Sequence, residues 1–147
     1  MISEQVVGLP ELDAFAKKLV PLVMQARVVA LIGPLGAGKT TLVRALARQM
    51  RIAGAIVSPT FTYMVTYQMP NGMLLHHFDL YRITSAQQFY EAGFNEYLNQ
   101  PNSLSFIEWP ELILDSLPDK TLTVTFEYID EQFDKRKITV STPVESV

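Results

Sequence analysis

Residues 33–40 constrain the fold of this chain more than any other segment. They read GPLGAGKT and match the pattern G-x-x-x-x-G-K-[ST] at each of its fixed positions. An apolar run, 27–32, precedes them, and residues 41–50 have the composition of a helix. In a strand–turn–helix context, the backbone N–H groups of such a turn point inward and, with the helix N-terminus, favour a bound phosphate. The segment therefore predicts an α/β fold built around a phosphate-binding loop (P-loop), and an ordinary glycine turn is the weaker alternative.

The residues of this loop have distinct expected roles. Lys39 would approach the β- and γ-phosphates of a nucleotide, and the Thr40 hydroxyl would coordinate Mg²⁺. The full set expected to contact the nucleotide is Leu35, Gly36, Ala37, Gly38, Lys39, Thr40 and Thr41.

Composition indicates one globular domain over residues 1–147. Apolar residues make up 48% of the chain and charged residues 18%, which excludes a disordered chain. The absence of cysteine excludes disulfides, thiolate catalysis and zinc–thiolate sites. The N-terminus lacks a signal-peptide pattern, and glycines and Lys39 interrupt the most apolar segment. We therefore expect a cytoplasmic protein without a membrane span.

The charge balance argues against tight direct binding to nucleic acid. The formal net charge is −3, from 12 Lys+Arg and 15 Asp+Glu. Nucleic-acid backbones favour a basic surface, which this total does not supply. Arg44, Arg48 and Arg51 could form a local patch on one helix face, but a solvated helix flank is the favoured interpretation.

Periodicity and turn residues predict the remaining elements. The first helix should begin at Leu9-Pro10 and end near Leu19 or Val20, because Pro21 would limit it. Two strand-like runs flank the turn at 70–72 and predict an antiparallel hairpin. The expected helices cover 9–20, 41–50 and 84–91, and the expected strands cover 27–32, 56–57, 61–68, 73–80, 104–107, 121–129 and 135–141.

Together these elements predict a P-loop NTPase-like three-layer sandwich. Its central sheet should be mixed and mostly parallel, with antiparallel hairpin strands. The strand before the P-loop and the strand ending at Glu108 should lie parallel at the centre of the sheet.

Two carboxylates follow apolar runs, where an open α/β sheet presents its site residues. Asp79 follows LLHHF and Glu108 follows LSFI. Nucleotide hydrolysis needs a carboxylate to hold Mg²⁺ and a group to position the attacking water. Either acid could take either role. We favour Glu108 for orienting water and Asp79 for the metal side, and Thr40, Asp79 and Glu108 are the candidate metal ligands.

Further candidates surround these acids. Pro59 stiffens the segment 58–60, where Thr60 could bring a hydroxyl to the γ-phosphate, although an ordinary turn is an alternative. His77 shares a strand face with Asp79 and could support this carboxylate. His76 and His77 make a poor metal site without more ligands, so a satisfied structural role is favoured for the histidines. The expected catalytic set is Lys39, Thr60, Asp79 and Glu108.

Four segments in order resemble the TsaE (YjeE) family: GPLGAGKTT at 33–41, SPTFT at 58–62, HFDLYR at 77–82 and IEWPE at 107–111. The resemblance runs from about Leu9 to the region of Arg136. It implies a Mg²⁺-dependent ATPase of tRNA threonylcarbamoyladenosine synthesis. It also implies TsaB-like and TsaD-like partners, with tRNA reached only through their complex. In that family the ATPase supports repeated turnover by TsaD and is not itself the transferase.

Two other function classes stay open at the level of the sequence. A small-molecule kinase shares the P-loop, but only Arg82 and Arg136 follow Arg51, which disfavours an arginine-bearing lid. A nucleotide-binding switch without its own turnover would look like a slow ATPase. The chain has no N-K-x-D motif, so ATP is favoured over GTP. Lys135 and Arg136 could approach the base, although a solvated turn is favoured there.

Overall fold

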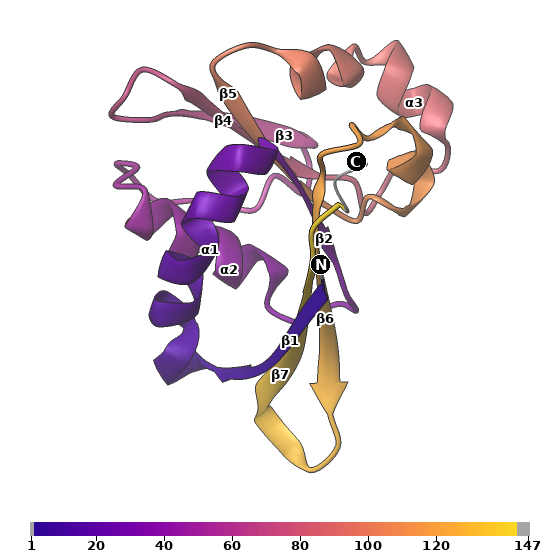
Figure 1. The fold of residues 1–147 in the computed structure, drawn as a ribbon. Coiled ribbons are helices and arrows are strands. Elements are labelled where there is room, and N and C mark those ends of the chain that lie inside the picture. The colour runs from indigo at the N-terminus through magenta and orange to yellow at the C-terminus, as the bar shows by residue number, and fades with distance from the viewer. Residues whose placement is uncertain (1, 144–147) are drawn as a thin grey trace.

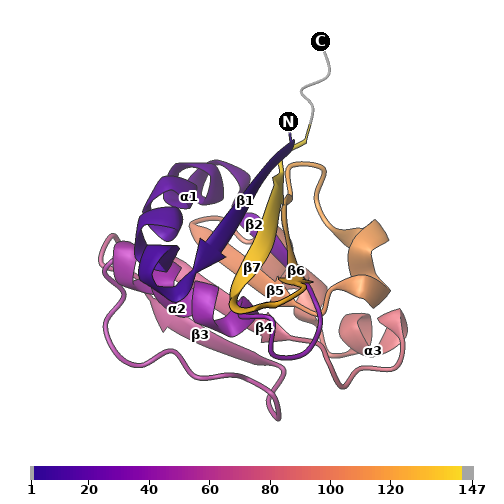
Figure 2. The same cartoon turned by 90° about the horizontal axis from the view of Figure 1, so that it is seen from below.

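The computed structural model describes residues 2–143 and has a seven-stranded sheet at its centre. Helices α1 and α2 cover one face of this sheet, and α3 with two short 3₁₀ helices covers the other (Figures 1 and 2). The strands are β1 (Ile2–Gly8), β2 (Val28–Ile32), β3 (Met64–Gln68), β4 (Leu74–Asp79), β5 (Ser103–Glu108), β6 (Leu122–Ile129) and β7 (Gln132–Ser141). The helices are α1 (Leu12–Ala26), α2 (Lys39–Gln49) and α3 (Ala86–Glu91), and the 3₁₀ helices are η1 (Leu9–Glu11), η2 (Phe94–Asn99) and η3 (Glu111–Ser116).

The strand order β1-β7-β6-β2-β5-β4-β3 confirms the expected mixed sheet. Strand β2 pairs in parallel with both β5 and β6, and β4 pairs in parallel with β5. Antiparallel pairing is confined to β3 with β4, β6 with β7, and β7 with β1. Strands covered by helices on both faces are buried along their length, which explains why every residue of β5 is buried. The predicted three-layer, P-loop NTPase-like arrangement is therefore confirmed.

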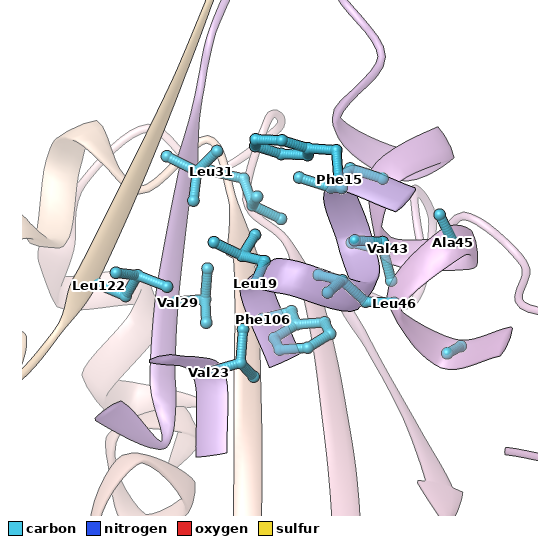
Figure 3. Close-up of a cluster of buried hydrophobic side chains, with 14 of the residues drawn as sticks. Phe15, Leu19, Val23, Val29, Leu31, Val43, Ala45, Leu46, Phe106 and Leu122 are labelled. Atoms are coloured by element: carbon cyan, nitrogen blue, oxygen red, sulfur yellow. The ribbon is translucent and has the colours of Figure 1, made fainter. Parts of the chain in front are cut away.

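The larger core lies between the sheet and helices α1 and α2. Phe15, Leu19 and Val23 of α1 face Leu46 of α2 and Phe106 of β5 (Figure 3). A second core of aliphatic and aromatic residues lies on the opposite face, where Phe78 contacts Phe89 and Phe94 at centroid distances of 6.0 and 5.7 Å. The two cores pack against opposite faces of β4 and β5. This packing holds in place the C-terminal ends of these strands, where Asp79 and Glu108 lie.

Helix α1 continues to Ala26, so the expected end before Pro21 was wrong. Pro21 is exposed, and the carbonyl that loses its helical partner can bond to water instead. Val23 and Ala26 continue the buried stripe of Phe15 and Leu19 beyond the proline. Burial of each large apolar side chain contributes about 1.5–3 kcal/mol, which offsets the cost of about 3 kcal/mol for an interior proline.

Two strand predictions also need correction. Strand β1 was not expected from the sequence, and it pairs along its whole length with β7, from Ile2 opposite Ser141 to Gly8 opposite Lys135. Residues 56–57 form no strand. Side chains hold them instead: Arg44 Nε donates to the Ile56 carbonyl at 3.1 Å, and the Val57 N–H donates to the Tyr67 hydroxyl at 3.0 Å.

The remaining predicted elements are confirmed with small shifts at their ends. Strands β3 and β4 form the antiparallel hairpin, which begins only at Met64 because Tyr63 closes a turn by donating its N–H to the Pro59 carbonyl at 2.8 Å. Ser85 caps α3 by accepting the Gln88 N–H. Within residues 2–143, no helix has both the length and the apolar character needed to cross a membrane.

Candidate functional site

The loop between β2 and α2 has the shape that its sequence predicts. Gly36 and Gly38 have φ angles of +76° and +105°, which residues with a Cβ atom rarely adopt. The Ala37 N–H donates to the Pro34 carbonyl at 3.1 Å, and the Tyr128 hydroxyl of β6 donates to the Leu35 carbonyl. Helix α2 follows directly, and the first N–H groups of a helix have no partner within it. The loop therefore presents unpaired donors at the positive end of a helix, as anion binding requires.

Lys39 lies folded back onto the loop. Its Nζ donates to the Gly33 carbonyl at 2.6 Å and lies 3.2 Å from the centre of the Trp109 ring. The side chain is buried, and desolvation lowers the pKa of Lys39 below its ordinary value of 10.5. The nearby carboxylates Glu108, Glu111 and Asp79 act against this shift. The Lys39 ammonium therefore lies beside the P-loop and contacts the Gly33 carbonyl and the Trp109 ring. A phosphate oxygen could replace these contacts.

Glu108 ends β5 and is tied to the P-loop. Thr40 Oγ1 lies 2.8 Å from each carboxylate oxygen of Glu108 and donates to the pair. His77 Nε2 lies 2.6 Å from Glu108 Oε2. Glu108 is only 4% exposed, so these two donors are what stabilise its buried charge.

Asp79 ends the neighbouring strand β4, directly opposite Glu108 in the parallel register. Its Oδ1 accepts the Tyr81 N–H at 3.0 Å. Its Oδ2 lies 3.4 Å from the Ser58 hydroxyl and 3.5 Å from the Thr60 hydroxyl, and these two hydroxyls are 2.9 Å apart. The segment 58–60 is therefore brought to the carboxylate, although through long contacts.

The two histidines divide their roles differently from the expectation. Support of Asp79 was one possible role for His77, but its ring contacts Glu108 instead, because it reaches across to the neighbouring strand β5. His76 is a satisfied structural histidine, as predicted. Its Nδ1 lies 2.9 Å from the Thr66 hydroxyl and its Nε2 lies 2.6 Å from Gln100 Oε1.

One cavity of about 330 Å³ joins these groups. It contains all four expected catalytic residues and all seven expected P-loop contacts. The other lining residues are Ser58, Tyr81, Arg82 and Trp109. Trp109 has a φ angle of +59° and packs against Tyr81 at a centroid distance of 4.9 Å, while the Arg82 guanidinium lies 4.8 Å from the centre of the Phe61 ring.

A second cavity of about 210 Å³ adjoins the first and was not predicted from the sequence. The two share Gly36, Ala37 and Gly38 of the P-loop and Thr41 of α2. The second cavity extends between β1–η1 and the β6–β7 hairpin. Its other lining residues are Val7, Gly8, Leu9, Leu12, Phe126, Phe133, Asp134, Arg136 and Ile138. Arg136 thus lines a cavity beside the P-loop, where a solvated turn had been favoured. Lys135 is not among the lining residues.

Arg44 and Arg48 of α2 fit the favoured interpretation, in which they belong to a solvated helix flank and not to a nucleic-acid-binding patch. Arg48 pairs with Asp13 of α1 at 2.7 Å in an exposed ion pair, and Arg44 donates to the Ile56 carbonyl. Both side chains thus have partners within the chain.

The oxygen donors of the larger cavity suit Mg²⁺. Thr40 offers a hydroxyl, and Asp79 and Glu108 offer carboxylates on adjacent strand ends. Residues 2–143 contain no cluster of three or more His, Cys, Asp or Glu side chains that could hold a metal ion. Mg²⁺ needs no such cluster, since one or two carboxylates with substrate phosphates and water complete its shell. The donor set therefore fits this ion when a nucleotide is present.

Comparisons with known proteins agree with this architecture. A family model described as "Threonylcarbamoyl adenosine biosynthesis protein TsaE" matches residues 8–138. The tRNA threonylcarbamoyladenosine biosynthesis protein TsaE of Rickettsia felis is 39% identical over 78% of this chain and 68% of its own. The protein of the same name from Haemophilus influenzae is 34% identical over 80% of this chain and 76% of its own. The crystal structure of Bacillus subtilus YdiB is 26% identical with a TM-score of 0.66, covering 98% of this chain and 88% of that one. This chain therefore belongs to the TsaE family.

Proposed function

We propose that this protein binds ATP with Mg²⁺ in the larger cavity and hydrolyses it to support tRNA threonylcarbamoyladenosine synthesis. TsaB-like and TsaD-like proteins would be its partners, and it would meet tRNA only through them, in the cytoplasm. The observation that carries this proposal is one cavity in which the P-loop, Lys39 and the carboxylates of Asp79 and Glu108 meet. Membership in the TsaE family supports the biological setting.

The residues of the cavity would divide the work as follows. The P-loop N–H groups bind the phosphates, and Lys39 exchanges the Gly33 carbonyl for a phosphate oxygen. A bound Mg²⁺ would supply neutralisation of the charge that develops on the phosphates. Thr40 and Asp79 supply oxygen ligands on the metal side. Glu108 accepts a hydrogen bond from the water that attacks the γ-phosphorus in line, as the bond to the ADP oxygen breaks.

The second cavity would seat the base and sugar of the nucleotide. It shares the P-loop with the first cavity, so a ligand whose phosphates lie on the loop can extend into it. Val7, Phe126 and Ile138 give it apolar walls, and the side chain of Phe133, 90% exposed, stands free at its rim. Exposed aromatic rings beside a cavity offer stacking partners for a purine.

A small-molecule kinase is less well supported. Residues 122–141, which a kinase of this size would need in part for a lid, form the strands β6 and β7 of the sheet. A nucleotide switch without turnover would use the same cavity. An experiment that measures hydrolysis distinguishes such a switch from an ATPase.

The deciding experiment measures ATP hydrolysis by this protein alone and with its TsaB-like and TsaD-like partners, beside tRNA modification over several turnovers. We expect phosphate release to water without an added acceptor, and loss of release in Glu108→Ala with nucleotide binding retained. Glu127→Ala, at an exposed position on β6, serves as the control. ATP binding without release under any condition would identify a switch instead, and transfer to a small acceptor would identify a kinase.

A further inference from the structure

The imidazole of His77 is placed in a way that packing alone does not explain. The ring is fully buried, and its Nε2 lies 2.6 Å from Glu108 Oε2. Because a carboxylate accepts hydrogen bonds, the geometry assigns the ring proton to Nε2. Nδ1 is also buried and has no hydrogen-bond partner within residues 2–143. An unpaired buried nitrogen costs free energy that an apolar side chain of similar size would avoid.

The neighbouring histidine shows what a purely structural role looks like in the same strand. His76 is 1% exposed, and both of its nitrogens have partners, Thr66 and Gln100. It lies on the opposite face of β4, away from Glu108. Among the residues that the structure describes, the one polar contact of the His77 side chain is with Glu108 of the candidate active site, whereas the contacts of the His76 side chain are with Thr66 and Gln100.

Glu108 has two donors, and the proposed function would remove one of them. Thr40 now donates its hydroxyl proton to the Glu108 carboxylate. If Thr40 becomes a metal ligand, its oxygen turns to the ion. The contact to His77 is then the remaining fixed contact of Glu108. It involves Oε2 and leaves Oε1 free to accept from water.

We propose that His77 is a positioning residue that holds Glu108 Oε2 through its Nε2–H, so that Oε1 addresses the attacking water. This inference rests on the proposed ATP hydrolysis. Groups that orient a functional carboxylate or ligand typically change activity by about 10–100-fold when they are removed. The proposal predicts that the loss falls on turnover and not on nucleotide binding.

Three variants test this role in the full chain with its partner proteins. His77→Leu removes the donor, His77→Gln keeps an N–H that can reach the same oxygen, and His76→Leu is the matched loss of a buried imidazole. We expect His77→Leu to lower kcat by about 10–100-fold with KM for ATP within about twofold of wild type. His77→Gln should recover most of this loss, and His76→Leu should keep the wild-type kcat. Equal losses in His77→Leu and His76→Leu, or no recovery in His77→Gln, would overturn the proposal.

A second measurement needs neither nucleotide nor metal. Nitrogen-15 NMR of the free protein should show His77 with a proton on Nε2 and none on Nδ1, and Glu108→Ala should shift the Nε2 signal. A proton on Nδ1 would overturn the inference. Should wild type release no phosphate with its partners, the proposed hydrolysis fails, and the NMR result alone then decides whether His77 holds Glu108.

Discussion

Two opposing effects act on the pKa of Lys39. Burial lowers the pKa of its ammonium, and three carboxylates, Glu108, Glu111 and Asp79, act against that shift. The Gly33 carbonyl accepts a hydrogen bond from the Lys39 ammonium, and the Trp109 ring lies against it. Because this charge is costly to bury, we do not expect Lys39 to stabilise the fold.

Lys39→Met tests that interpretation. The thioether fills similar space without charge, so we expect ADP affinity to fall by at least about 100-fold while the melting temperature stays equal or rises, because a desolvated charge has gone. Calorimetric titration with ADP and thermal melts give the two quantities. Lys17→Met, at an exposed position of α1, controls for the substitution itself. A large drop in melting temperature would instead mark Lys39 as structural.

Trp109 should report nucleotide binding by fluorescence. It is the one tryptophan of the chain, and its ring lies 3.2 Å from Lys39 Nζ at the wall of the larger cavity. When Lys39 turns to a phosphate, the ring loses this cation, so its emission should change in a saturable way on titration with ADP. Lys39→Met should abolish this saturable change. Emission that stays constant while calorimetry shows binding would contradict the expected movement of Lys39.

At the scale of single elements, the sequence predicted those structures that depend on interactions between residues close together in the chain. The P-loop, the hairpin of β3 and β4, and the cap of α3 at Ser85 follow from residues close in sequence. Strand β1 could not be predicted, because its first residues are exposed and its pairing depends on β7, more than 120 residues away. The contact between His77 and Glu108 was missed for a similar reason. Strand alternation gives the face of His77, but only the register with β5 gives its partner.

Helix α1 continues through Pro21, a residue that usually ends a helix, and the cost of this proline can be measured. Pro21 lies on its exposed side and removes one helical hydrogen bond. We expect Pro21→Ala to raise the free energy of unfolding by about 1–2 kcal/mol, less than the full cost of an interior proline, because the more flexible unfolded chain offsets part of the gain. Urea unfolding measures the change, and Lys18→Pro, at an exposed interior position of the same helix, should lower stability. A loss of stability in Pro21→Ala would mean that packing of the proline ring matters more than its missing N–H.

At the scale of the whole molecule, the two cavities depend on segments from both ends of the described chain. The P-loop forms their shared wall, while β1–η1 and the β6–β7 hairpin enclose the second cavity. This hairpin extends from the sheet at the end where the P-loop lies (Figure 1). The P-loop was predictable from one contiguous segment. The proposed base site was not, because its walls meet only after β1 adds to β7.

Phe133→Ser tests whether the two cavities act as separate parts of one nucleotide site. The Phe133 side chain is 90% exposed, so its removal should leave the fold unchanged. Loss of stacking worth about 1 kcal/mol should weaken ADP binding about fivefold, whereas the affinity for pyrophosphate should not change. Calorimetric titrations of both ligands measure this difference, and Leu112→Ser on η3, at the opposite face of the sheet, is the control. Equal weakening of ADP and pyrophosphate would place Phe133 in the phosphate site, and no change for ADP would remove the second cavity from the nucleotide site.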